Sequence, residues 1–354
     1  MGGQSGEHSI SLRSAATVRD ALVGAGHDVV PIGITRAGAW QVRNFDALLD
    51  QARSDLVEIE PVPGAAVTLA RAARGPAGES RTEIVALEGD HAGGPGTPID
   101  VVFPLVHGTG GEDGTLQGLL ELLDVPFVGA GCLASAMAMD KIASKTLCAG
   151  AGIAQAEFLV AGGRDANELA GAIDAAFGFP CFVKPSALGS SVGISRVASR
   201  DELAAALVEA RRWDRRVIVE QAVDVREIEV AMLGNAEPEI SPPGEIIVSG
   251  GFYDFDSKYV DDDAELVAGA EVPEAQLADI RDIALEFWRL IGCRGMARAD
   301  FFIERTSGRV LLNEINTIPG FTAISMYPRL WAVAGIDLPR LVDRLVGLAL
   351  AEDA

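Results

Sequence analysis

Residues 311–320 read LLNEINTIPG, a run that begins like a buried strand and ends on a Pro-Gly turn. Residues two apart on a strand point to the same side, so Glu314 and Asn316 would present their oxygens together. Just upstream, GMARADFFIE gives Arg298 and Asp300 the same spacing. The RTSGR segment between the two runs is a turn signal. The pattern therefore predicts a β-hairpin that gathers all four polar side chains on one patch.

The oxygens of Asp300, Glu314 and Asn316 form a hard donor set. Mg²⁺ prefers such donors, usually keeps several waters, and takes further ligands from phosphates. The alternative is an ordinary hairpin with a solvated polar face, and these residues taken alone favour it, because short motifs often match by chance. The remainder of the chain has to decide between the two interpretations.

The composition of the 354 residues limits the class of protein. The length allows two or three domains, each with a core of its own. No apolar run has the length of a membrane span and no signal-peptide pattern opens the chain, so we expect a soluble cytoplasmic protein. A net charge of −22 repels nucleic acid and anionic membrane surfaces. Any phosphate ligand must then be met by individually placed cations, backbone N–H groups and metal.

The four cysteines are widely spaced, with no C-x-x-C pair, and we interpret them as small apolar residues in a reducing compartment rather than as a zinc site or a disulfide framework. They are Cys132, Cys148, Cys181 and Cys293.

Three regions differ in their pattern of apolar residues. Residues 1–133 alternate helical and strand patterns, which predicts an α/β domain with a parallel sheet. The segments are a helix over 14–25, the strand DVVPIGI, the buried run IDVVFPLVHG and the helical EDGTLQGLLELLD. Residues 134–223 open in a helix that ends at Gly152 and predict a compact α+β unit. Residues 224–354 hold a long strand, an amphipathic helix, the hairpin and closing helices. Within this third region, residues 237–270 are the best candidate for a mobile lid.

Three further segments carry candidate chemistry. The loop KPSALGSSVG follows a strand and suits either a phosphate or a plain turn, and Lys141 and Lys184 are either phosphate ligands or surface lysines. Glu220 and Glu227 fit a nucleoside site or exposed strand ends. The segment VHGTGGEDGTLQG places His107 and four glycines at the carboxyl end of a predicted strand, where ligands bind in α/β sheets.

Taken together, these segments resemble one family. The motifs occur in the same order from Gly2 to about Leu345: GGQSGEHSISLRSA, FPLVHGTGGEDGTLQG, FVGAGCLASAMAMDK, KPSALGSSVGIS, EQAVDVREIEVAMLG, FYDFDSKY, GMARADFF and NEINTIPGFTAIS. They look like the successive motifs of D-alanine:D-alanine ligases, members of the ATP-grasp superfamily. The resemblance implies an ATP-grasp fold of three domains, with boundaries that we place at 1–133, 134–223 and 224–354.

The resemblance also implies a reaction and its cofactors. ATP phosphorylates the carboxylate of one D-alanine, and the amine of a second D-alanine displaces the phosphate to give a dipeptide for peptidoglycan precursor synthesis. Two Mg²⁺ ions, for which Mn²⁺ is an alternative, would be held by Asp300, Glu314 and Asn316. The family further implies a homodimer, with D-alanine and ATP as its small-molecule partners.

The family's site residues map onto this chain by motif. Glu7 would hold the ammonium of the first D-alanine with His107 nearby, and Arg298 and the backbone N–H of Gly320 would stabilise the tetrahedral oxyanion. The expected ATP ligands are Lys141 and Lys184 for the phosphates, the linker Glu220, Gln221, Ala222 and Val223 for adenine, and Glu227 for ribose.

The lid motifs map in the same way. Ser190 and Tyr259 match the pair that closes the lid over the second substrate, and Lys258 would reach the transferred phosphate. Ser325 and Met326 would line the second subsite. Ligases that make D-alanyl-D-lactate lack the tyrosine at the position of Tyr259, so its presence favours an amine nucleophile.

One departure from the family concerns the start of the chain. Members carry a strand immediately before the Gly-Gly loop, whereas here Met1 is followed directly by Gly2 and Gly3. The N-terminal sheet is therefore expected to lack its first strand, either because the start was assigned too late, which we favour since the downstream motifs are intact, or because the product is impaired. Two other functions stay open: a ligase for D-lactate or D-serine, and a nucleotide-binding protein without turnover.

Overall fold

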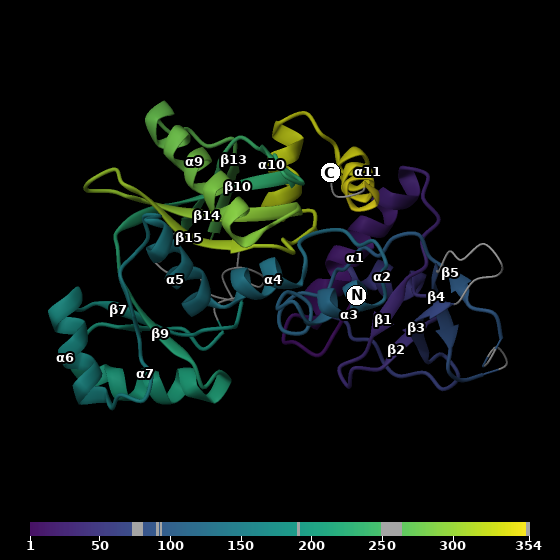
Figure 1. The fold of residues 1–354 in the computed structure, drawn as a ribbon, viewed down its shortest axis with the longest axis horizontal. Coiled ribbons are helices and arrows are strands. Elements are labelled where there is room, and N and C mark those ends of the chain that lie inside the picture. The colour runs from purple at the N-terminus through teal and green to yellow at the C-terminus, as the bar shows by residue number, and fades with distance from the viewer. Residues whose placement is uncertain (73–80, 90–91, 93, 190–191, 249–263, 352–354) are drawn as a thin grey trace.

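The computed structural model describes residues 1–72, 81–89, 92, 94–189, 192–248 and 264–351 (Figure 1). The described chain is a mixed α and β protein built around several antiparallel sheets. No helix in these ranges combines the length and the apolarity needed to cross a bilayer. The division into three domains at residues 133 and 223 stays a prediction.

The first region holds short elements around the long helix α1. They are α1 (His8–Gly24), β1 (Ile32–Ile34), β2 (Trp40–Val42), α2 (Asp46–Ala52), β3 (Val67–Ala72), β4 (Arg81–Ala86), β5 (Thr97–Pro98) and α3 (Thr115–Leu122). Helix α4 (Cys132–Met139) crosses from the first region into the second.

The predicted parallel sheet of this region is wrong for its named strands. Strands β1 and β2 pair antiparallel, as do β3, β4 and β5. The physical reason for the antiparallel pairing of β1 and β2 is the short connection between them. Five residues allow a hairpin but not the long crossover that parallel strands need. Among the described residues, parallel pairing occurs only as isolated bridges, between Gly2 and Ile34 and between Val102 and Phe127.

The start of the chain lies against β1. The Ile34 N–H donates to the Met1 carbonyl and the Gly3 N–H donates to the Ile34 carbonyl, each at 2.9 Å. Residues 1–3 thus contact β1 as an isolated bridge rather than as a strand, and the loss of a first strand stays a prediction.

The single helix expected up to Gly152 is wrong, because Asp140 interrupts it. Its backbone is extended (φ −82°, ψ 104°), and its carboxylate accepts a hydrogen bond from the Ala143 N–H at 2.9 Å. An aspartate with these features is a helix N-cap. Helix α4 therefore ends at Met139, and α5 begins at Lys141.

The second region is the expected α+β unit. It consists of α5 (Lys141–Ala151), β6 (Phe158–Val160), α6 (Ala166–Ala176), β7 (Cys181–Pro185), β8 (Ser195–Val197), α7 (Arg200–Trp213) and β9 (Val217–Gln221). The strands form an antiparallel sheet in the order β6-β9-β7-β8, and α6 and α7 bury one face of it.

The third region contains the predicted hairpin. Its elements are β10 (Val225–Gly234), β11 (Glu239–Ile240), β12 (Gly244–Val248), β13 (Ala264–Ala268), α9 (Glu274–Ile291), β14 (Gly295–Glu304), β15 (Val310–Asn316), α10 (Met326–Val333) and α11 (Leu338–Leu350). The strands form a sheet in the order β13-β12-β10-β14-β15, with β11 on β10. The prediction of a mobile lid over 237–270 is wrong at both ends of this segment, because β11, β12 and β13 extend the sheet there. Its middle, residues 249–263, lies outside the described ranges.

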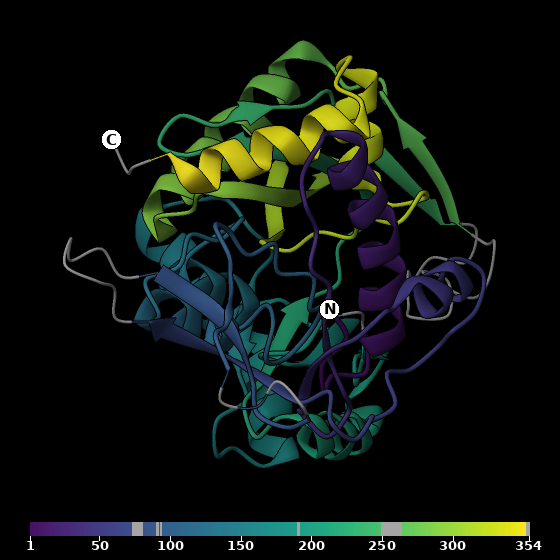
Figure 2. The ribbon, with the colours of Figure 1, turned by 90° about the vertical axis from the view of Figure 1, so that its right-hand side faces the viewer.

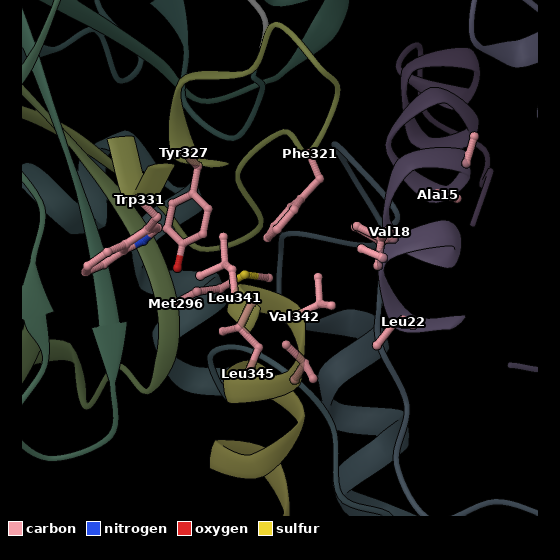
Figure 3. Close-up of a cluster of buried hydrophobic side chains, with 14 of the residues drawn as sticks. Ala15, Val18, Leu22, Met296, Phe321, Tyr327, Trp331, Leu341, Val342 and Leu345 are labelled. Atoms are coloured by element: carbon pink, nitrogen blue, oxygen red, sulfur yellow. The ribbon is translucent and has the colours of Figure 1, made fainter. Parts of the chain in front are cut away.

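The two faces of this sheet bury different cores. Helix α9 packs on the face that carries Ile228, Val230 and Met232. The opposite face, with Ala231 and Leu233, contributes to a core shared with α10, α11 and α1. The shared core joins the first helix of the chain to the last (Figures 2 and 3).

We expect Gly295, at the start of β14, to tolerate no side chain. Its φ is +73°, and a Cβ would lie 2.8 Å from the backbone of Gly129, which precedes α4. Gly335→Ala is the matched control, because Gly335 also has a positive φ (+82°) but has open space around its Cβ position. Urea denaturation should show a loss of about 1 kcal/mol for Gly335→Ala and about 1–3 kcal/mol more for Gly295→Ala. Equal losses would contradict a close approach of the two backbones.

Candidate active site

A single pocket lies where the hairpin meets the N-terminal region. Its walls come from β10, β14, β15, the loop before α10, the start of α1 and the loop around His107. Eleven of the residues expected from the sequence line it: Glu7, His107, Lys141, Glu227, Arg298, Asp300, Glu314, Asn316, Gly320, Ser325 and Met326.

Arg298 is fixed by two carboxylates. Its Nε and Nη2 donate to the two oxygens of Asp300, each at 2.7 Å, and Nε lies 3.2 Å from Oε1 of Glu229. Burial would lower the pKa of Arg298, but the neighbouring carboxylates raise it well above its usual value. Glu229 is not among the residues expected from the sequence, although it lies two residues after Glu227 on β10 and so shares the face of that residue.

The predicted metal ligands lie on paired strands. Asp300 is opposite Glu314 and Arg298 is opposite Asn316 in the β14–β15 register, so the hairpin prediction is confirmed. Lys141 Nζ lies 3.9 Å from Glu314 Oε2. The described ranges contain no cluster of three or more His, Cys, Asp or Glu side chains placed to hold a metal. Two carboxylates and an amide oxygen nevertheless fit Mg²⁺, which needs few protein ligands when phosphates and waters supply the rest.

His107 links the N-terminal region to the loop after the hairpin. Its Nδ1 lies 3.2 Å from Glu112 Oε1, and its Nε2 lies 2.9 Å from Ser14 Oγ. The same Ser14 Oγ accepts a hydrogen bond from the Phe321 N–H at 3.3 Å. Burial would lower the pKa of His107, but the hydrogen bond to Glu112 and the charges of Glu112 and Glu7 together raise it. One hydrogen-bond network of Glu112, His107 and Ser14 thus holds Phe321, the residue after Gly320. No local sequence signal points to Ser14.

Gly320 itself has a steric requirement. A Cβ at this position would lie 2.7 Å from Ser325 Oγ, which accepts a hydrogen bond from the Thr322 N–H at 3.0 Å. The turn that ends LLNEINTIPG is therefore packed closely against Ser325, at the start of α10.

The remaining expected nucleotide ligands do not line this pocket. Lys184 on β7 donates to Glu220 Oε2 on β9 at 2.8 Å. The Nζ of Lys145, which is not among the residues expected from the sequence, lies 3.7 Å from the same oxygen. Burial would raise the pKa of Glu220, but Lys145 and Lys184 lower it to about 2.

The linker after Glu220 is tied into the second region, since the N–H groups of Gln221 and Ala222 donate to backbone carbonyls of Glu157 and Pro180. Val223 follows them before β10 begins. Ser190, Lys258 and Tyr259 lie outside the described residues, so their roles stay predictions.

The family of the chain follows from comparison with known proteins. The family descriptions "D-ala D-ala ligase N-terminus" and "D-ala D-ala ligase C-terminus" match residues 1–130 and 147–347. The chain belongs to the D-alanine–D-alanine ligase family. The resemblance drawn from the sequence motifs is therefore confirmed.

Individual members of the ligase family are similar over nearly the full chain. A D-alanine–D-alanine ligase of Thermoanaerobacter sp. (strain X514) is 42% identical over 99% of this chain and 94% of its own length. The solved D-alanine-D-alanine ligase of Coxiella burnetii superposes with a TM-score of 0.79 at 35% identity, over 99% and 92% of the two chains. The VanG D-Ala:D-Ser ligase of Enterococcus faecalis superposes with a TM-score of 0.81 at 32% identity, over 99% and 97%. Fold alone therefore does not separate two ligases with different second substrates.

We expect Glu112→Gln to change how stability depends on pH. Because its pKa is raised in the folded protein, charged His107 stabilises the fold fully at pH values below 6.5, the pKa of a histidine in the unfolded chain. This contribution is lost as the pH rises through the pKa of the folded state. Removing the carboxylate should therefore lower the free energy of unfolding by about 1–3 kcal/mol at pH 6 and by less at pH 9. Urea denaturation at both pH values measures this, with the exposed Glu60→Gln as control. An equal loss at both pH values would show that the ion pair is not responsible.

Proposed function

We propose that this chain uses ATP to join two molecules of D-alanine into D-alanyl-D-alanine, a precursor of peptidoglycan. The observation that carries the proposal is the single pocket in which Arg298, Gly320 and the hairpin carboxylates meet Glu7 and His107. One substrate-holding carboxylate, one oxyanion site and one candidate metal site in the same pocket suit the activation of a carboxylate by ATP.

The reaction proceeds in two steps. A carboxylate oxygen of the first D-alanine attacks the γ-phosphorus of ATP, which gives D-alanyl phosphate and releases ADP. The deprotonated amine of the second D-alanine then attacks the carbonyl carbon, and phosphate leaves as the amide forms. The first step is needed because a free carboxylate has no adequate leaving group.

Arg298 and the Gly320 N–H stabilise the tetrahedral oxyanion of the second step. Arg298 suits this role because Asp300 and Glu229 fix its guanidinium before substrate arrives, so little reorganisation is needed as charge develops. Glu7 binds the ammonium of the first D-alanine, and the His107 network supports the Gly320 turn.

Asp300, Glu314 and Asn316 would hold two Mg²⁺ ions, with Mn²⁺ as the alternative. A metal bound by these side chains would neutralise charge that develops on the transferred phosphoryl group. Arg298 already occupies both oxygens of Asp300, so metal binding has to share or displace one of these hydrogen bonds.

The other roles follow the motifs. Lys141 and Lys184 bind the ATP phosphates, Glu227 the ribose, and Ser325 and Met326 the second D-alanine. The linker Glu220, Gln221, Ala222 and Val223 binds adenine. Ser190 and Tyr259, with Glu7, close the lid over the second substrate, and Lys258 reaches the transferred phosphate. Closure matters because an acylphosphate exposed to water hydrolyses. A homodimer in the cytoplasm remains our expectation.

Phosphate release by the purified chain with ATP, Mg²⁺ and D-alanine tests the proposal. Release should depend on D-alanine, should fail with L-alanine, and should yield the dipeptide on chromatography. D-serine or D-lactate as the preferred second substrate would identify one of the alternative ligases. ATP binding without any turnover would leave the nucleotide-binding alternative.

Arg298→Met should lower kcat by about a hundredfold or more, the typical effect of losing one oxyanion donor, with little change in ATP binding. Arg305→Met is the matched control, because Arg305 follows β14 directly and is exposed. Steady-state kinetics of phosphate release measures both variants. Full activity of Arg298→Met, or an equal loss in Arg305→Met, would refute the assigned role.

A further inference from the structure

The few lysines of this chain gather near one buried carboxylate. Only four of its 29 basic residues are lysines. Three of them, Lys141, Lys145 and Lys184, act electrostatically on one buried carboxylate, that of Glu220. The fourth, Lys258, lies outside the described ranges. Lysine presents a compact point charge where arginine presents a broad planar fork, so this choice suits a confined site.

Lys145 has no role among the expected site residues, yet its burial requires an explanation. It is 3% exposed, and its Nζ is a buried donor with no hydrogen-bond partner in the described part of the chain. It lies one helical turn after Lys141 on α5, on the same face of the helix. Burying an ammonium group without hydrogen bonds is unfavourable unless another group compensates for it.

Glu220 supplies that compensation. Lys145 Nζ lies 3.7 Å from Glu220 Oε2, the oxygen that also accepts the 2.8 Å hydrogen bond from Lys184. The other oxygen, Oε1, is buried and has no hydrogen-bond partner within the described ranges. Both lysines thus lie beside Oε2, and Oε1 is the carboxylate oxygen that has no partner among the described residues.

The protonation state of that carboxylate decides what it binds. An ionised carboxylate only accepts hydrogen bonds, whereas a protonated one also donates. A 6-amino purine presents N–H donors to such an acceptor. A 6-oxo purine presents a carbonyl oxygen at the same place, which an ionised carboxylate repels.

We propose that Lys145 is a positioning residue that keeps the Glu220 carboxylate ionised and fixed, so that the nucleotide site selects a 6-amino purine over a 6-oxo purine. This inference rests on the proposed function, in which Glu220 borders the adenine. Without Lys145, the Glu220 carboxylate would have only Lys184 as an ion-pair partner among the described residues. Lys145, on α5, supplies a second.

The test compares the binding of ADP and inosine diphosphate by calorimetry, with Mg²⁺ and without D-alanine. The wild-type chain should prefer ADP. Lys145→Met keeps most of the side chain's volume but removes its charge, and it should weaken ADP binding roughly tenfold to a hundredfold while changing inosine diphosphate binding much less. The ratio of the two dissociation constants should therefore shrink, and the KM for D-alanine should stay unchanged.

Glu220→Gln provides a second variant if Lys145→Met does not fold. A glutamine can donate to a 6-oxo group, so this variant should also lose its preference for ADP. A Lys145→Met protein that retains the wild-type ratio, or that loses both nucleotides equally, would overturn the inference, as would a wild-type chain without preference. Because binding is measured without D-alanine, a failure of the ligase reaction would be seen separately in the phosphate-release assay.

Discussion

The apolar core shared by the two ends of the chain determines where the site is assembled. Helix α1 packs against α11, and Phe321, Tyr327 and Trp331 fill the space between these helices and the third-region sheet (Figure 3). Phe321 is fully buried, with its ring edge-on to Phe103 at 6.0 Å and tilted against Tyr327 at 5.3 Å. Because Gly320 immediately precedes Phe321, this packing brings the Gly320 turn to the loops that carry Glu7 and His107.

A second constraint is charge. A protein with a net charge of −22 that handles a polyphosphate needs cations at fixed places. Here the cations are held by buried or half-buried carboxylates: Arg298 by Asp300 and Glu229, and Lys184 and Lys145 by Glu220. Each pairing prevents the cation from extending into solvent and gives it one orientation. Under the proposed function, the same carboxylates would compete with the phosphates for these cations.

The sequence predicted the parts of the site that depend on local spacing. The two-residue spacing in MARAD and NEIN predicted that these polar side chains share one patch of a hairpin. The position of His107 at the end of an apolar run predicted that it lies at a ligand site, and it lines the pocket. Ser14, Glu229 and Lys145 were missed because their roles arise from contacts with residues far away in the sequence, which no local pattern records: Ser14 with His107 and Phe321, Glu229 with Arg298, and Lys145 with Glu220. The parallel sheet was wrong for a related reason: an apolar run indicates burial but not strand pairing. Leu105 and Val106 in the run over 99–108 are buried, yet within the described ranges the run forms no named strand and pairs only through an isolated bridge between Val102 and Phe127.

Glu314 and Asn316 face the pocket only because β15 is irregular. Val310 and Leu312 face the α9 core, and strict alternation would also turn Glu314 toward it, since that residue has the same parity. The register shifts between Asp300 and Phe301, where Phe301 pairs with Leu312 but Asp300 pairs with Glu314. The extra residue, Asn313, reverses the parity, so Ile315 returns to the core while Glu314 and Asn316 face the pocket. A one-residue bulge thus separates a buried strand from a candidate metal site, as bulges next to active sites commonly do.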